Sequence, residues 1–296
     1  MGGLLSGLSR FGLGSLEGMD LYSKPKQEEK EKEKEKKVEE KKAAPVVQEQ
    51  DLLFDKTYRC PVCDKEFKAR TVKVGKARLI GSDSDLRPKY EQVDMLKYDV
   101  IMCPRCGYAA LSRYFKFITT PQAKLIKEKI TANFKSRDEA PKEVYTYDEA
   151  LERYKLTLVN AIVKLAKSSE KAYICLKTAW LLRGKGEHLD KEEKDYAEKK
   201  KKIDEEEREF LKNSLDGFLA ARQSETFPMC GMDESTVDYL IAVTAAKFEQ
   251  YDVAMKLISG VLVSTSANTR MKDRARAFKE QIMKQIKMKN AAGSEG

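Results

Sequence analysis

Apolar residues recur at a helical spacing throughout the second half of the chain. After Pro121 they follow at intervals of about four, as in Ile126, Ile130 and Phe134, which places them on one side of a helix. Thr146 and Asp233 precede such stretches and belong to residue types that cap helices. We predict helices that begin near residues 121, 146, 169, 190, 234, 251 and 268.

Two of these helices carry more specific predictions. The helix after Thr146 should bury an apolar stripe that ends with Ile162 and Leu165. In the helix over residues 190–223, Tyr196, Ile203 and Phe210 repeat every seven residues. Charged residues occupy the complementary positions of this repeat, so we predict a projecting, solvent-exposed helix with a narrow apolar stripe.

The part before Thr120 has a different pattern. Short β-like pieces at 67–74 and 98–102 alternate with turn-rich stretches such as 81–85. We predict an α+β, mainly α fold, in which a small β zinc ribbon precedes an all-α, tetratricopeptide-like domain. The predicted parts are an apolar, glycine-rich segment (1–22), a Lys/Glu-rich flexible linker (23–51), the zinc ribbon (52–120), the helical domain (121–290) and a disordered tail (291–296).

The helical half contains a faint internal repeat. Tyr147-Asp148-Glu149-Ala150 recurs as Tyr251-Asp252-Val253-Ala254, and Tyr-x-x-Ala is how tetratricopeptide repeats begin their second helix. Glu249 occupies the place of the usual turn glycine. A plain helical bundle would produce a similar spacing, so both readings stay open.

Composition and charge narrow the class of protein. The chain of 296 residues has a net charge of +9, and residues 52–120 and 268–290 each contribute +6. No apolar run approaches the ~18 residues that span a bilayer, and no secretory signal is recognisable. We therefore expect a cytoplasmic protein without integral membrane association, in which paired cysteines indicate metal or redox chemistry.

Two CPxC motifs are the strongest chemical signal. Cys60 and Cys63 form the first pair, and Cys103 and Cys106 form the second. Two intervening residues let one tight turn direct both sulfurs at one ion, and two such turns complete a tetrahedral site. We predict that these four cysteines bind one structural Zn²⁺, and that the insertion between the pairs holds an extra strand and an acidic turn at 82–85.

Other interpretations of the cysteines are weaker. Iron is the rival metal, and a redox dithiol would normally occur once, at a helix start within a βαβ pattern. Cys175, on an apolar helical face, is interpreted as a small buried hydrophobe. Cys230 precedes the Asp233 cap, and a fifth metal ligand or a reactive thiol is the sharper hypothesis for it.

The CPxC…CPxCGY head, Phe67, and the later Gly231-Met232-Asp233-Glu234 segment resemble an uncharacterised bacterial family. Its members pair a zinc-ribbon-like head with a tetratricopeptide-like helical tail. The likeness covers about Leu52 to Lys289. It implies the same two-part architecture and the same four cysteine ligands, and it brings no activity with it.

The resulting functional prediction is an adaptor that binds a protein partner through its helical repeats. Nucleic-acid binding is the alternative, because Phe67 lies within a basic cluster and the last helix carries a basic side. The cluster consists of Lys65, Lys68, Arg70, Lys73, Lys76 and Arg78. The single histidine, His188, excludes centres that need two. No enzyme motif is present, so we predict no catalytic residues, no cofactor-binding residues other than the metal ligands, and no enzymatic activity.

Overall fold

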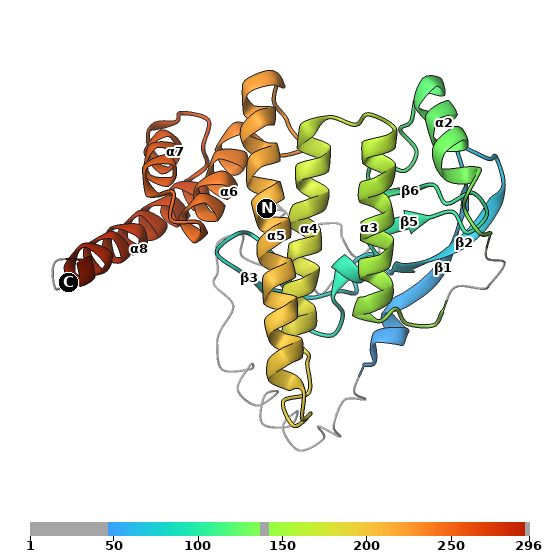
Figure 1. The fold of residues 1–296 in the computed structure, drawn as a ribbon, viewed down its shortest axis with the longest axis horizontal. Helices are drawn as coiled ribbons and strands as arrows, with labels where there is room; N and C mark the ends of the chain where they lie inside the picture. The colour runs from blue at the N-terminus through green and yellow to red at the C-terminus, as the bar shows by residue number, and fades with distance from the viewer. Residues whose placement is uncertain (1–46, 137–141, 294–296) are drawn as a thin grey trace, which may run out of the picture. The chain divides into compact units, whose positions relative to one another are not determined.

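The computed structural model describes residues 47–136 and 142–293, with side chains up to residue 289. The predicted apolar segment 1–22 and nearly all of the linker 23–51 lie outside the described residues. The described chain starts with small antiparallel sheets and continues as a series of helices (Figure 1). This order confirms the predicted fold class.

Three β-hairpins make up the first part. Strand β1 (Leu53–Arg59) pairs with β2 (Glu66–Val72), β3 (Leu79–Ser82) pairs with β4 (Pro88–Tyr90), and β5 (Val100–Met102) pairs with β6 (Ala109–Leu111). Short 3₁₀ turns, η3 (Glu49–Leu52) and η4 (Met95–Tyr98), precede β1 and β5. Strands β3 and β4 lie within the insertion between the cysteine pairs, where the sequence predicted one extra strand and an acidic turn.

Most helices begin within a residue or two of the predicted positions, but the helix predicted from residue 190 begins only at Tyr196. Three of the starts carry a local signal in the form of a side-chain cap. Thr119, Thr146 and Asp233 each accept a hydrogen bond from a backbone N–H of the first turn. The helices are α2 (Thr120–Ile126), continued by the π-helical η5 (Lys127–Thr131), α3 (Tyr147–Val163), α4 (Ser168–Glu187), α5 (Tyr196–Ser224), α6 (Glu234–Lys247), α7 (Tyr251–Val263) and α8 (Thr269–Gly293).

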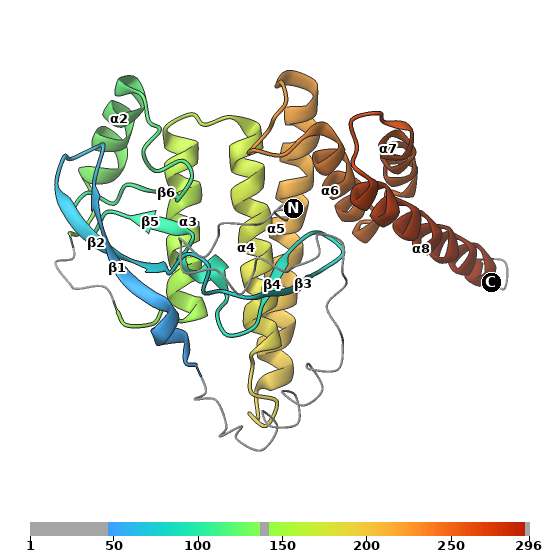
Figure 2. The ribbon, with the colours of Figure 1, turned by 180° about the vertical axis from the view of Figure 1, so that it is seen from behind.

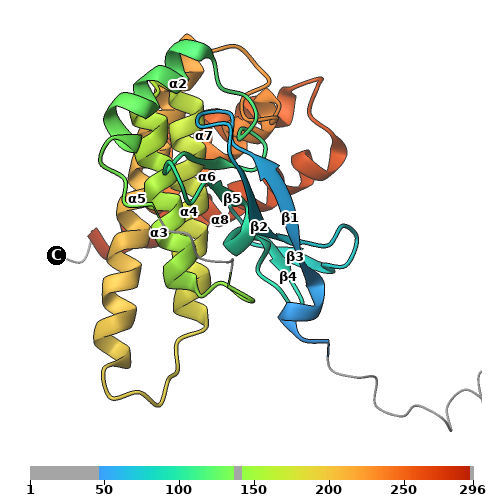
Figure 3. The same ribbon diagram turned by 90° about the vertical axis from the view of Figure 1, so that its right-hand side faces the viewer.

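Helices α3, α4 and α5 lie side by side, and the hairpins cover one face of this layer (Figures 2 and 3). Helices α6, α7 and α8 continue beyond α5 (Figure 1). One core spans the predicted boundary at residue 120, since Val100 and Leu111 pack in the same cluster as Ala150 and Tyr154. The buried Tyr154 hydroxyl also donates to the Leu96 carbonyl, at 3.1 Å.

The prediction for α5 is only partly correct. Most positions from 196 to 210 are exposed or half-buried beside a narrow buried stripe, but the helix does not project from the fold. Helix α5 packs along α4, and Ile203, Leu211, Leu215 and Phe218 are buried. Of the predicted repeat Tyr196, Ile203 and Phe210, only Ile203 is buried, so these residues mark just one side of the buried stripe of α5. The buried positions shift from 203 to 211 and 218 because they follow the 3.6-residue period of a straight helix.

The predicted stripe on α3 is only partly correct. Leu151 and Tyr154 are buried, whereas Ile162 and Leu165 are exposed. The polar Asn160 takes the inward position near the end of the helix and is fully buried. The last apolar residues of this segment therefore face solvent.

The two copies of the Tyr-x-x-Ala motif occupy equivalent positions. Tyr147 and Tyr251 are the first residues of α3 and α7, and Ala150 and Ala254 are fully buried one turn later. Glu249 adopts a left-handed φ of 59°, the conformation for which a glycine is usually used. Repeat-like stacking itself stays a prediction.

Candidate metal centre

Two equivalent turns carry the four cysteines. The first turn joins β1 to β2, and the second joins β5 to β6. In the first turn the Cys60 N–H donates to the Lys65 carbonyl (3.0 Å), and the Asp64 N–H donates to the Cys60 carbonyl (2.9 Å).

The second turn repeats both hydrogen bonds. The Cys103 N–H donates to the Tyr108 carbonyl (2.8 Å), and the Gly107 N–H donates to the Cys103 carbonyl (3.1 Å). Gly107 has a φ of 74°, and Asp64 has a φ of 61° at the corresponding position. An aspartate thus adopts the left-handed conformation that glycine provides without strain.

The two turns bring the four sulfurs together. All four Sγ atoms lie within 4.8 Å of one another, with Cys60 and Cys106 at 3.5 Å and Cys63 and Cys103 at 3.7 Å. Ligands about 2.3 Å from a tetrahedral zinc are separated by about 3.8 Å, whereas a disulfide needs about 2.05 Å. The spacing therefore matches shared coordination of one ion.

Backbone donors surround the sulfurs in the same symmetric way. The N–H groups of Cys63 and Val62 are directed at Cys60, and those of Cys106 and Arg105 are directed at Cys103. Hydrogen bonds from Cys106 and Cys60 lower the pKa of Cys103 to about 2. Because Cys60 is the donor to Cys103 and is buried, its pKa is raised to about 12. Without a cation, the raised pKa values of Cys60 and Cys106 keep these two thiols protonated, whereas a bound dication would favour their thiolate forms.

A small apolar core holds the first turn. Phe67 packs edge-on against Phe115, with ring centroids 5.9 Å apart. Both rings belong to a buried cluster with Cys60, Cys103 and Cys106, to which Ile126 and Ile130 contribute from α2 and η5. The metal centre is thus continuous with the start of the helical half.

The second turn is held by side chains from the helical half. The Asn160 amide donates to the Gly107 carbonyl (3.1 Å), and the Thr131 hydroxyl donates to the Cys106 carbonyl (3.0 Å). The Phe134 ring lies so close to Gly107 that a Cβ there would be 2.5 Å from it. The contribution of these three residues to the site was not predicted from the sequence. For Asn160, the available signal was a polar residue among the buried positions of α3.

The other two cysteines do not join this group. Cys175 is buried on α4, and burial raises its pKa to about 11, which confirms the interpretation as a small hydrophobe. The Cys230 thiol donates to the Ser169 carbonyl at 3.2 Å, and burial raises its pKa above the ordinary value. Among the described residues the cysteine group that can hold a metal comprises the four predicted ligands, so Cys230 is not a fifth ligand.

The basic cluster after the first cysteine pair is only partly available to a ligand. Arg70 pairs with Asp55 and Arg78 pairs with Glu91, while Lys68 and Lys76 are exposed. Phe67 is buried and therefore offers no ring for stacking on a base.

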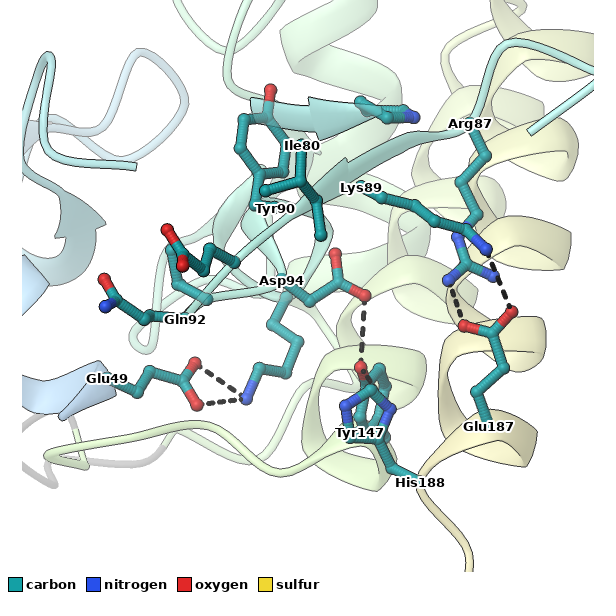
Figure 4. Close-up of a pocket in the computed structure, with 14 residues that line it drawn as sticks. Glu49, Ile80, Arg87, Lys89, Tyr90, Gln92, Asp94, Tyr147, Glu187 and His188 are labelled. Atoms are coloured by element: carbon teal, nitrogen blue, oxygen red, sulfur yellow. Dashed lines mark hydrogen bonds and ion pairs between the residues drawn. The ribbon is translucent and has the colours of Figure 1, made fainter. Parts of the chain in front are cut away.

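A polar pocket of about 250 Å³ lies at the other end of the hairpin layer (Figure 4). Asp94 accepts hydrogen bonds from the Leu96 N–H (3.0 Å) and the Tyr147 hydroxyl (3.2 Å). Burial raises the pKa of the Asp94 carboxyl. The exposed His188 lies beside Tyr147, with 3.3 Å between its Nδ1 and the hydroxyl oxygen.

The cations of this pocket are engaged by carboxylates of the same pocket. Lys97 is bound by Glu49, and Arg87 and Lys89 are bound by Glu187 (Figure 4). The titratable side chains of this pocket can bind and exchange protons.

Cysteine-bearing hairpins followed by packed helices define the class of this protein as one with a head in which four cysteines are positioned to bind a metal, and a helical second half. The chain belongs to the family described as "Uncharacterized protein conserved in bacteria (DUF2225)", whose model matches residues 53–282. The match confirms the predicted resemblance. Neither the curated proteins nor the solved structures contain a match. Within the described residues, no helix combines the length and apolar character required to cross a bilayer.

Proposed function

We propose that this chain is a zinc protein whose metal is structural and whose helical half binds a protein partner, without catalysing a reaction. The grouping of four sulfurs within 4.8 Å of one another on two equivalent turns is the observation that carries the metal assignment. Four protein ligands leave no coordination position for a substrate, which is typical of structural zinc.

The choice of zinc rests on the ligand chemistry. Four thiolates suit zinc or iron, and closed four-cysteine sites on paired turns are most often zinc sites. Four thiolates and Zn²⁺ carry a net charge of −2. The N–H groups of Val62, Cys63, Arg105 and Cys106 that face the sulfurs offset this charge.

The partner-binding part of the proposal is supported by how the helices are stacked. Each helix from α3 to α8 contacts the next one along the chain, as in solenoid proteins, which use such stacks as binding surfaces. The equivalent placement of Tyr147 and Tyr251 at the starts of α3 and α7 favours tetratricopeptide-like units.

The metal is tested by elemental analysis of protein purified from its native cell. We expect about one zinc per chain in the wild type and in a Cys175→Ser control, and loss of zinc in Cys103→Ser. Stoichiometric iron, or metal-free protein that is folded, would overturn the assignment.

Partner binding is tested by affinity purification of the tagged full-length chain with and without nuclease. Recovery of the same protein partner in stoichiometric amount after nuclease supports the adaptor. Recovery of nucleic acid alone would replace it with the second candidate.

That second candidate, nucleic-acid binding, is favoured by one observation on α8. Arg270, Lys284 and Lys287 are exposed there, and no ion pair involves them among the described residues. Affinity that falls steeply with salt would support this candidate, whereas an apolar contact would respond little.

A further inference from the structure

A groove of about 520 Å³ lies where the α3–α4 connection meets the segment that follows α5. We call it the corner groove. Its walls come from the loop before α2, from the α3–α4 corner and from residues 225–231. The connections α3–α4 and α5–α6 both lie at the upper end of the helices in Figure 1. The polar pocket of Figure 4 is a different site, which lies beside Glu187 and His188 at the other end of α4.

Large apolar side chains stand exposed at the corner groove. Phe117 is 76% exposed and Leu165 is 79% exposed. Val159 and Ile162, also exposed, precede Leu165 at three-residue spacing, so they continue along the same side of α3. An apolar strip of this length suits a segment of polypeptide better than a small molecule.

The backbone conformation of Leu165 indicates that the exposure of its side chain has a function. Leu165 follows the end of α3 with a φ of 55°, and the next N–H, of Ala166, donates back to the Ala161 carbonyl at 2.9 Å. Glycine is the usual residue at this position of a helix end. A leucine there is strained, and its side chain gains little burial in return. Strain without local benefit is a feature of functional sites.

A second left-handed turn contributes to the wall formed by residues 225–231. Met229 and Met232 exchange two backbone hydrogen bonds, of 3.0 and 2.8 Å, around Cys230 and Gly231, which have φ values of 51° and 73°. This is a two-residue turn with both central residues left-handed. It includes the start of the Gly-Met-Asp-Glu segment on which the family resemblance rests.

The groove carries a small positive excess, because its three cations (Arg113, Lys164 and Lys167) outnumber the carboxylates of Glu170 and Glu225. The Lys164 ammonium is satisfied by Glu170 at 2.7 Å, and the Glu225 carboxylate accepts from the Ser169 N–H at 3.0 Å. Lys167 is exposed, and among the described residues it has no carboxylate partner. The Arg113 guanidinium is also exposed and has no carboxylate partner there, although it donates to the Cys230 carbonyl and lies over the Tyr173 ring. The N-terminal end of α4 is already capped by Glu225, so Lys167 and Arg113 supply the positive charge of the groove.

We propose that the corner groove binds an acidic, apolar segment of a partner protein. In this arrangement a large apolar side chain of the partner lies between Phe117 and Leu165, and neighbouring carboxylates face Arg113 and Lys167. This inference rests on the proposed adaptor function and identifies the surface that performs it.

The test selects peptides from a random phage-displayed library on immobilised full-length protein and measures their affinity by fluorescence anisotropy. We expect the selected peptides to carry Leu, Ile or Phe within two residues of Asp or Glu. Affinity should fall at least tenfold in Leu165→Gly and in Lys167→Glu. It should be unchanged in Val263→Ser, which alters an equally exposed apolar residue on α7 (81% exposed).

Leu165→Gly separates binding from folding. Because glycine adopts this φ without strain, the variant should unfold at the same or a higher temperature and retain its zinc while it loses the peptides. If the selected peptides bind Leu165→Gly and Lys167→Glu as tightly as they bind the wild type, the corner groove is not the binding surface. The proposed adaptor function would still stand. Failure to select any peptide would contradict both proposals.

Discussion

Arg183 of α4 binds both carboxylate oxygens of Asp85, with N···O distances of 3.0 and 2.7 Å. Asp85 is fully buried in the turn between β3 and β4, 98 residues before its partner. The same guanidinium also binds Asp83 and, from α5, Glu207. One arginine therefore fastens the insertion between the cysteine pairs to two helices.

We predict that Arg183→Met destabilises the protein strongly. The substitution leaves Asp85 charged, buried and without its bidentate partner, which costs about 3–5 kcal/mol of unfolding free energy. Arg183→Lys should recover only part of this loss, because an ammonium does not reproduce the planar pair of donors. Urea denaturation measures both changes.

The matched control is Lys201→Met on α5, which removes an exposed pair with Glu205 at 3.9 Å. Its effect should stay within about 0.5 kcal/mol. Equal losses in the two methionine variants would show that the buried network contributes nothing specific.

Asp85 and Asp94 should respond to pH in opposite directions. Burial raises the pKa of Asp85, but the hydrogen bonds and charge of Arg183 more than offset it, so the net pKa lies below the ordinary value. Its stabilising contribution is complete above the unfolded pKa of about 3.9 and is lost as the pH falls through the folded pKa. Burial leaves the pKa of Asp94 raised, so ionising this group destabilises the fold increasingly as the pH rises above about 3.9.

The asparagine variants isolate these two effects. Asp85→Asn should be less stable than the wild type at pH 7. Asp94→Asn should be more stable at pH 7, because its amide oxygen can still accept from the Leu96 N–H and its NH2 group can donate to the Tyr147 hydroxyl. This advantage should disappear near pH 4. Denaturation at pH 4, 5.5 and 7 checks this. A loss of stability at pH 7 in Asp94→Asn would contradict the assignment.

Local chemistry explains which features were predictable from the sequence. The cysteine pairs are recognisable because two residues between the ligands let one turn direct both sulfurs at an ion. Thr146 and Asp233 are recognisable because a helix cap acts within one helical turn. The burial of the end of α3 and the packing of α5 were mispredicted because both depend on neighbouring elements. Asn160 faces inward to reach the Gly107 carbonyl, 53 residues away, and no periodicity encodes that contact.

The acidic turn at 82–85 illustrates the same limit. Its composition predicts a turn, and a turn is found there between β3 and β4. The burial of Asp85 within it follows from Arg183, whose own position depends on the packing of α4 against α5. A charged pair that distant in sequence leaves no local pattern to read.

The equivalent turn positions Gly107 and Asp64 should respond oppositely to substitution. Gly107→Ala puts a methyl group 2.5 Å from the Phe134 ring at a φ of 74°, so we expect a loss of at least about 2 kcal/mol and weaker zinc retention. Asp64→Gly relieves a φ of 61°. It removes only an exposed ion pair with Arg59 and should be neutral or slightly stabilising. Thermal unfolding with zinc content measured in parallel tests both, and destabilisation by Asp64→Gly would contradict the equivalence of the turns.

Removing the metal should loosen the hairpins and the end of α3 together while leaving α6, α7 and α8 protected. The metal contributes on the order of 10 kcal/mol to a core that includes Cys60, Phe67 and Ile130, and Asn160 links that core to α3. Helices α6–α8 contribute no residue to it. Hydrogen exchange with and without a zinc chelator measures the effect by segment, and Cys103→Ser serves as the control because the chelator should change it no further. Uniform deprotection of the whole chain would mean that the helical half depends on the metal centre, whereas unchanged exchange in β1, β2, β5 and β6 would mean that no structural metal is bound there.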